Sequence, residues 1–229
     1  MRSRTCPILL LLALVAPAAA EVDAGLQRLG WRELTFDGKT PNRFAIGEGD
    51  AVEIGGQGSV SVLWRALPGD LNDLDLHWRW RVDVAPPESD LTRKGGDDRA
   101  LALYVSFAFD PSGAGFVERA KRALVAPFVD QELPGRVLMY VWAGRGDTTG
   151  VWFDNPWLEG VGKYRILRGP EAELGTWYDE HVDLEADFRQ AFGEPITAKT
   201  GPYQLAISAD GDDTGATLRA AVADIRFGP

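Results

Sequence analysis

Two acidic segments that contain glycine carry the residues best suited to bind a metal ion. One precedes an apolar segment and the other follows one, and their carboxylates are Asp97, Asp98, Asp210, Asp212 and Asp213. Calcium takes about six to eight oxygen ligands, commonly from carboxylates and loop carbonyls. We therefore predict a structural calcium ion here, provided that both segments lie at one end of the fold. The alternative is two solvated turns in which Asp and Gly supply the turn geometry.

A second group of residues has the types that a sugar-binding surface uses. The chain has eight tryptophans, and two of them, Trp152 and Trp157, flank a loop that contains Asn155. Aromatic rings stack on the apolar face of a sugar, while amides and carboxylates bind its hydroxyls. We predict that a neutral, sugar-like ligand contacts Trp152, Asn155, Trp157, Trp142, Tyr104 and Arg79. The same loop could instead fold back to cover the core.

Part of this ligand surface is expected on the polar side of one sheet. Arg79, with His77 and Arg81, would lie near Tyr104 if the strands that carry them are neighbours. The alternative is a solvated sheet face with Arg–Asp pairs. A zinc site would need two or three convergent ligands, so we interpret His77 and His181, the two histidines of the chain, as surface or sheet residues.

The sequence contains no well-specified catalytic motif such as GxSxG, HExxH or a Walker loop. Paired carboxylates about 5–10 Å apart could hydrolyse a glycosidic bond, and Asp73, Asp75 and Glu180 are nominal candidates. Two functions therefore remain open. The first is a non-catalytic binding module for a glycan or cell-envelope component, and the second is a carbohydrate-active hydrolase.

The first twenty residues have the pattern of an export signal. Arg2 and Arg4 precede a short apolar segment, 8–15, and small residues at 18–20 provide a cleavage site. We predict cleavage before Glu21 and a single mature domain, 21–229, that is periplasmic or secreted. The only cysteine lies inside the signal, so disulfides and Cys-ligated metals are excluded from the mature chain.

The charge of the chain limits its partners. The net charge is −10, and loss of the two signal arginines would make it −12. A field of this sign repels nucleic acid and anionic membranes and attracts cations. No segment outside the signal has the roughly 20 apolar residues that span a bilayer.

The apolar residues recur mainly with period two, which predicts short strands. The clearest segment is 74–84, and others are 100–110, 137–143 and 203–209. In 217–227 the phase changes near Ala223-Asp224, which indicates a β-bulge. Short helices are expected at 184–192, capped by Asp183, and near 115–126. Frequent turn signals and the absence of βαβ alternation predict an all-β, antiparallel β-sandwich of jelly-roll type over about residues 28–228.

Several short motifs occur in the order found in a known bacterial family. They are WRWRV (78–82), GGDD (95–98), YVW (140–142), WYDE (177–180), DFRQAFG (187–193) and DGDDT (210–214). In this order they resemble the exported family of domain of unknown function 3047, which implies an all-β fold and a periplasmic setting but no activity. The C-terminal VADIRF also resembles the last strand of galactose-binding-like jelly rolls, where the equivalent of Asp224 is often near a structural calcium.

Overall fold

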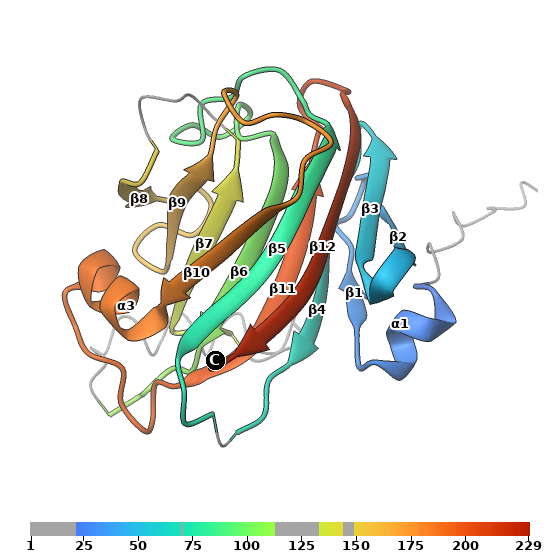
Figure 1. Ribbon diagram of the computed structural model, residues 1–229. Coiled ribbons are helices and arrows are strands. Elements are labelled where there is room, and N and C mark those ends of the chain that lie inside the picture. The colour runs from blue at the N-terminus through green and yellow to red at the C-terminus, as the bar shows by residue number, and fades with distance from the viewer. Residues whose placement is uncertain (1–21, 70, 113–132, 144–148) are drawn as a thin grey trace, which may run out of the picture.

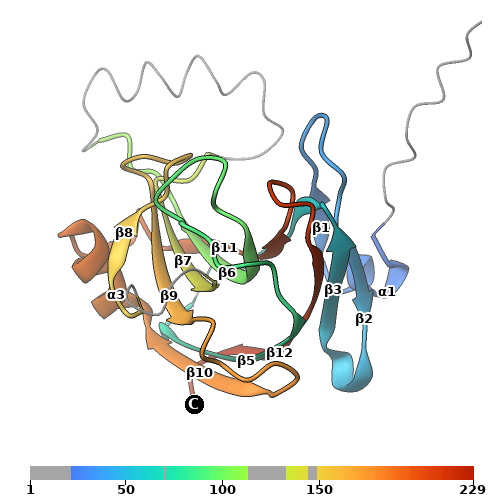
Figure 2. The ribbon, with the colours of Figure 1, turned by 90° about the horizontal axis from the view of Figure 1, so that it is seen from above.

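The computed structural model describes residues 22–69, 71–112, 133–143 and 149–229, which form two β-sheets packed face to face (Figures 1 and 2). In spatial order, the seven-stranded sheet contains β1 (Arg32–Leu34), β4 (Val60–Ala66), β11 (Pro202–Asp210), β6 (Arg99–Phe107), β7 (Arg136–Trp142), β9 (Gly162–Arg168) and β8 (Trp152–Asp154). The five-stranded sheet contains β10 (Tyr178–Asp183), β5 (Asp75–Val84), β12 (Thr217–Phe227), β3 (Val52–Gln57) and β2 (Arg43–Ile46). The predicted all-β sandwich is confirmed, although β7 and β9 pair in parallel.

The alternating sequence of β5 explains how the two sheets are held together. Leu76, Trp78, Trp80 and Val82 face the opposite sheet and are at most 2% exposed. The rings of Trp78 and Trp80 meet edge to face at 5.5 Å, and Trp142 of β7 packs on Trp80 at 5.8 Å. Each such buried side chain contributes about 1.5–3 kcal/mol to folding. Tryptophans therefore form much of the contact between the sheets.

The predicted bulge in β12 is present. The pairing of β12 with β5 shifts between Ala223 and Arg226, and Asp224 has a positive φ of 54°. The carboxylate of Asp224 pairs with Arg79 at 2.8 Å on the outer face of the five-stranded sheet. Asp224 is therefore not part of the acidic cluster described below.

Strand β10 was not predicted, and its sequence shows why. Val182 is buried as a strand residue should be, but the preceding inward position is the charged Glu180. Two donors satisfy this carboxylate, because Trp80 Nε1 and Arg168 Nε donate to its Oε1 at 2.9 and 2.7 Å. The buried partners allow a charge at a position where the alternation pattern requires an apolar residue.

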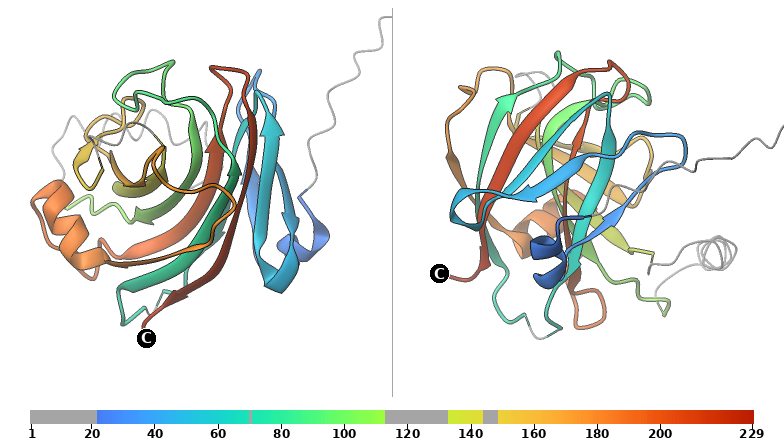
Figure 3. Two further views of the ribbon diagram at one scale, coloured as in Figure 1. Left: turned by 45° about the horizontal axis from the view of Figure 1, so that its top comes forward. Right: turned by 90° about the vertical axis from the view of Figure 1, so that its right-hand side faces the viewer.

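Among the described residues, two α-helices lie at opposite sides of the sandwich, as Figures 1 and 3 show. Helix α1 (Ala24–Arg28) is short and contacts β2. Helix α3 (Leu184–Phe192) was predicted, and its N-cap Asp183 accepts two backbone N–H groups, while Gly193 ends it in the left-handed conformation. A single-turn 3-10 helix, η1 (Glu48–Asp50), lies between β2 and β3.

The outer face of the seven-stranded sheet carries a second, smaller apolar cluster. Its members are Leu91, Ala102, Val137, Met139, Val141, Ala143, Tyr164 and Ile166. The cluster shows that this face is partly covered and not simply solvated.

The expected signal segment, 1–20, and the expected helix near 115–126 lie outside the described residues. In the part of the chain that the structure describes, no helix is long and apolar enough to span a membrane.

Candidate functional site

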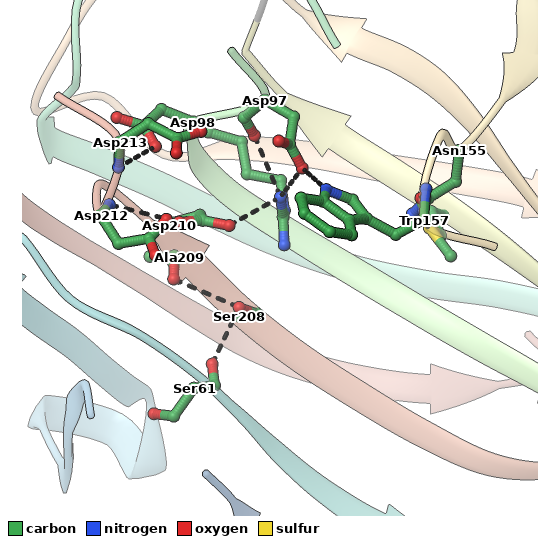
Figure 4. A network of polar contacts seen from close by, with 12 residues as sticks. Ser61, Asp97, Asp98, Asn155, Trp157, Ser208, Ala209, Asp210, Asp212 and Asp213 are labelled. Carbon is green, nitrogen blue, oxygen red and sulfur yellow. Dashed lines mark hydrogen bonds and ion pairs between the residues drawn. The ribbon is translucent and has the colours of Figure 1, made fainter. Parts of the chain in front are cut away.

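A buried arginine at the start of β6, Arg99, pairs with Asp97 and Asp210, two of the residues labelled in Figure 4. The sheet register places Arg99 directly opposite Asp210, the last residue of β11. Arg99 Nη1 lies 3.0 Å from Asp210 Oδ2 and 3.6 Å from Asp97 Oδ2. Its Nε donates to the hydroxyl of Tyr104 at 3.1 Å, and the guanidinium lies 6.0 Å from the ring centroid of Tyr164. One cation therefore links two acidic loops to the outer face of the sheet.

Burial controls the proton equilibria in this network. Burial raises the pKa of the Asp210 carboxyl to about 7, and Asp212 adds to the shift, whereas Arg99 opposes it. Burial also acts against the charge on Arg99, but the two tyrosines and two carboxylates around it outweigh this and raise its pKa. Arg99 is therefore charged at all ordinary pH values, while Asp210 titrates near neutrality.

Asp98 has a different role from Asp97, because it holds the turn between β11 and β12. Its Oδ1 accepts the backbone N–H of Asp213 at 3.1 Å. Its Oδ2 accepts the backbone N–H of Thr214 at 3.0 Å and the Thr214 hydroxyl at 2.5 Å. Gly215 completes the turn with a φ of 71°, which favours glycine. The two acidic loops thus lie at one end of the sandwich, as the calcium prediction required.

The structure narrows the predicted metal ligands from five to three. One carboxylate oxygen each from Asp98, Asp212 and Asp213 lies within 4.8 Å of the others, so these residues could hold a metal ion. Asp97 and Asp210 are not in this group because they pair with Arg99. Asp212 forms an ion pair with Lys39, which supplies a positive charge beside the group.

Trp157 is the predicted ligand residue that is clearly presented to solvent. Its side chain lies in the loop after β8 and the residue is 59% exposed, yet the indole Nε1 donates to Asp97 Oδ2 at 2.9 Å. The ammonium of Lys94 lies 4.8 Å from the ring centroid. Asn155 is buried and accepts the backbone N–H groups of Trp157 and Leu158 at 2.7 and 3.2 Å. Asn155 therefore fixes the conformation of the loop, and the hydrogen bond from Nε1 to Asp97 fixes the orientation of the Trp157 ring.

Two further tryptophans of the predicted ligand surface pack against other side chains. Trp142 is 3% exposed and belongs to the core between the sheets. Trp152 is half-buried, stacks edge to face with Tyr140 at 5.8 Å and donates its Nε1 to Gln190 at 3.2 Å. Trp142 is therefore mainly a core residue, although it also lines a pocket of about 270 Å³ with Ala143 and Leu174, and its expected ligand contact stays a prediction.

The six predicted ligand residues do not share one surface. Arg79 is on β5 of the five-stranded sheet, whereas Tyr104 is on β6 of the other sheet. Arg79 stacks over Trp177 at 4.9 Å, while Tyr104 accepts the hydrogen bond from Arg99. The hypothesis of one polar sheet face containing both residues is therefore corrected.

Sequence reasoning missed Arg99, the residue that joins the two acidic loops. By simple alternation, Arg99 would share the inward face of Leu101 and Leu103. The pairing of β6 with β11 shifts between Ser208 and Asp210, and Arg99 instead bonds to Tyr104 on the outer face. A bulge at the first residue of a strand does not change the apolar alternation of the strand, so the sequence gives no sign of it. The two acidic loops explain why Arg99 can be buried, because their carboxylates compensate its charge.

The fold and the network define a β-sandwich protein with an aromatic residue held at the rim of one sheet, an architecture that serves unrelated functions. The sequence matches, over residues 29–226, the family described as "Protein of unknown function (DUF3047)". The chain belongs to this family, which confirms the resemblance seen in the sequence. No curated protein matches it.

Solved structures with a similar strand arrangement include a family 11 carbohydrate-binding module from Clostridium thermocellum, at 9% identity and a TM-score of 0.41, covering 87% of this chain and 88% of that one. The endoglucanase cel12A from Rhodothermus marinus is similar at 12% identity and a TM-score of 0.45, covering 86% and 90%. A carbohydrate-binding module specific for non-crystalline cellulose, CBM28, is similar at 12% identity and a TM-score of 0.36, covering 88% of each chain. Similarities this distant leave the ligand of the present chain undefined.

Proposed function

We propose that the protein is a periplasmic or secreted, non-catalytic binding module for a neutral glycan or another component of the cell envelope. Export is supported by the charged, apolar and small-residue pattern of residues 1–20. Binding is supported above all by Trp157, a large exposed ring whose orientation is fixed by a hydrogen bond to a buried carboxylate.

A ring held in this way is suited to stacking on a sugar. The indole N–H of Trp157, the only donor of the ring, is hydrogen-bonded to Asp97, while the apolar surface of the ring stays exposed. Because the ring is already oriented, little conformational entropy is lost when a ligand stacks on it. The ammonium of Lys94 lies beside the ring and can donate to the hydroxyls of a stacked sugar.

Replacing this ring tests the proposed function. Trp157→Ala is expected to weaken binding of a neutral polysaccharide found on a glycan array by about 1–3 kcal/mol, as for aromatic stacking in general. The melting temperature should change by only a few degrees, since the exposed ring contributes little to the core. Affinity electrophoresis and thermal unfolding measure the two effects.

Phe36→Ala is the matched control for this experiment. Phe36 is 42% exposed and follows β1, at the edge of the seven-stranded sheet farthest from β8. This substitution should leave the affinity unchanged. Equal losses in both variants, or unfolding of Trp157→Ala, would contradict the proposal.

The hydrolase alternative receives less support from the carboxylate geometry. A pKa of about 7 for Asp210 suits a general acid, and Asp97 lies nearby. However, Arg99 contacts both carboxylates, and both are buried, so they do not face each other across an open cleft. Of the other candidates, Glu180 accepts hydrogen bonds from Trp80 and Arg168. Release of reducing sugar from a bound glycan would favour the hydrolase.

The acidic group in the two loops is proposed to hold a structural calcium ion. Asp98, Asp212 and Asp213 supply carboxylate oxygens, and carbonyls and water would complete the shell. Repulsion among these carboxylates contributes, with burial as the largest cause, to a raised pKa of Asp213. A cation at this position would relieve the repulsion that Lys39 now relieves in part.

Calcium is therefore expected to stabilise the fold. At about 100 times its Kd, calcium should add about 2.7 kcal/mol to the free energy of unfolding and raise the melting temperature accordingly. Asp213→Asn should abolish most of this gain, because it removes one of the three carboxylates of the group. The variant should still fold, since Asp213 is exposed and its side chain accepts no backbone hydrogen bond among the described residues. The control Asp154→Asn changes an exposed carboxylate paired with Lys163 and should keep the full gain. An unchanged melting temperature in millimolar calcium would reject the site.

A further inference from the structure

The two histidines of the chain, far apart in the sequence, meet on the outer face of the five-stranded sheet. His77 of β5 and His181 of β10 are direct partners in the antiparallel register. Their rings are stacked with centroids 4.3 Å apart and planes inclined by 10°. Cross-strand partners on one face of a sheet point the same way, so the two imidazoles present their edges side by side.

Carboxylates surround this histidine pair. Asp75 precedes His77 by two residues on the same face of β5, and its Oδ1 lies 3.2 Å from His181 Nε2. Asp179 precedes His181 by two residues and lines the same surface hollow. This hollow, of about 690 Å³, is formed by His77, Trp78, Asp179, Glu180, His181, Asp224, Ile225 and Arg226.

Two arginines lie near the histidine pair, and the charge of one of them is neutralised by an ion pair. Arg79 lies beside His77 on β5 but pairs with Asp224 at 2.8 Å. Arg226 of β12 is exposed and stands directly opposite His77 in the register. The local balance therefore favours a cation, and the net charge of −10 of the whole chain acts in the same direction.

We propose that His77 and His181 bind a divalent transition-metal ion of the zinc class, with Asp75 orienting His181 through its contact with Nε2. Imidazole is a common ligand for such ions, and water or a further carboxylate can complete the coordination. The Asp75–His181 hydrogen bond fixes the ring and leaves Nδ1 of His181 as the metal-binding nitrogen, which is the usual part of a carboxylate beside a liganding histidine. This proposal is independent of the proposed glycan function and uses residues of the opposite sheet.

Metal binding requires the two rings to turn, because stacked and nearly parallel imidazoles do not direct their ring nitrogens at one point. Zinc–nitrogen bonds of about 2.0–2.1 Å in a tetrahedral site place two nitrogens about 3.3 Å apart, with both lone pairs directed at the metal. The His181 side chain is 56% exposed, so its ring can tilt toward His77 without disturbing the core. Water or a nearby carboxylate would complete the coordination.

Titration of the untagged, chelator-treated protein with Zn²⁺, in competition with a chromogenic chelator, tests the site. The wild type should bind about one Zn²⁺ with micromolar or better affinity, and His77→Ala and His181→Ala should each lower the affinity at least about 100-fold. Asp75→Asn should lower it about 10–100-fold, as for other carboxylates that orient a liganding histidine. Co²⁺ should give visible absorption bands that both histidine variants lose.

Two further variants separate metal binding from a structural role. Arg226→Ala removes a cation beside the pair and should tighten Zn²⁺ binding, whereas loss of a merely structural residue would not. Asp154→Asn, an exposed carboxylate of β8 that pairs with Lys163, should leave Zn²⁺ binding unchanged. All variants should show the wild-type circular dichroism spectrum without metal. The proposal is overturned if the wild type binds no Zn²⁺ at about 100 μM or if His77→Ala binds it as tightly as the wild type.

Discussion

Arg99→Met is expected to lower the free energy of unfolding by about 3–5 kcal/mol, because it leaves two buried carboxylates without their cation. Asp97 and Asp210 are 5% and 7% exposed, and Arg99 is the positive charge between them. Methionine preserves most of the length of the side chain, so the loss reports the charge and its hydrogen bonds. Chemical denaturation monitored by tryptophan fluorescence measures the change.

The double variant Arg99→Met/Asp210→Asn tests whether the loss of stability comes from the unpaired carboxylates. Removing one stranded charge should recover part of the lost stability, since Asp210 is the closer partner of Arg99, at 3.0 Å. The exposed pair Arg189–Glu185 provides the comparison, and Arg189→Met should cost less than about 1 kcal/mol. A loss as small as this in Arg99→Met would show that the buried network does not hold the two loops.

Asp187→Ala is expected to lower the free energy of unfolding by about 2–4 kcal/mol, because it breaks the polar contact between α3 and the seven-stranded sheet. The buried hydroxyl of Tyr140 donates to Asp187 Oδ2 at 2.9 Å, and Arg165 donates to Oδ1 at 2.6 Å. The alanine variant leaves the Tyr140 hydroxyl buried without a partner, which is the costly part of the change. Urea denaturation compares the variant with the wild type.

A companion substitution separates the two contacts of Asp187. Tyr140→Phe removes the buried hydroxyl and should restore part of the stability in the Asp187→Ala background. Asp154→Ala breaks only an exposed pair with Lys163 and should cost less than about 1 kcal/mol. If Asp187→Ala costs no more than this control, apolar packing alone holds α3 in place.

The strands were predictable where burial follows a strict alternation. Segment 74–84 corresponds to β5, and 217–227 to β12 together with its bulge. Strand β10 escaped because Glu180 is an inward charge that is satisfied by partners distant in the sequence. The alternation of apolar residues indicates which face of a strand is buried. It carries no information about hydrogen-bond donors that another strand supplies to a buried charge.

The site was predicted only as far as local sequence allows. The two acidic loops do meet, and Asp98 binds the turn that contains Asp213 and Thr214. The ligand surface was wrong in its grouping, because Arg79 and Tyr104 belong to different sheets. Which sheet a strand joins depends on long-range pairing, and a polar face has the same sequence pattern in either sheet.

The order of the strands has a consequence for how the chain folds after synthesis. The last two strands, β11 and β12, are interior members of the seven-stranded and five-stranded sheets. Strand β12 separates β5 from β3, so neither sheet can be completed until the C-terminal residues are available. Pairings this distant along the chain form slowly. The chain is therefore expected to leave edges of β4, β6, β5 and β3 unpaired until β11 and β12 pair with them.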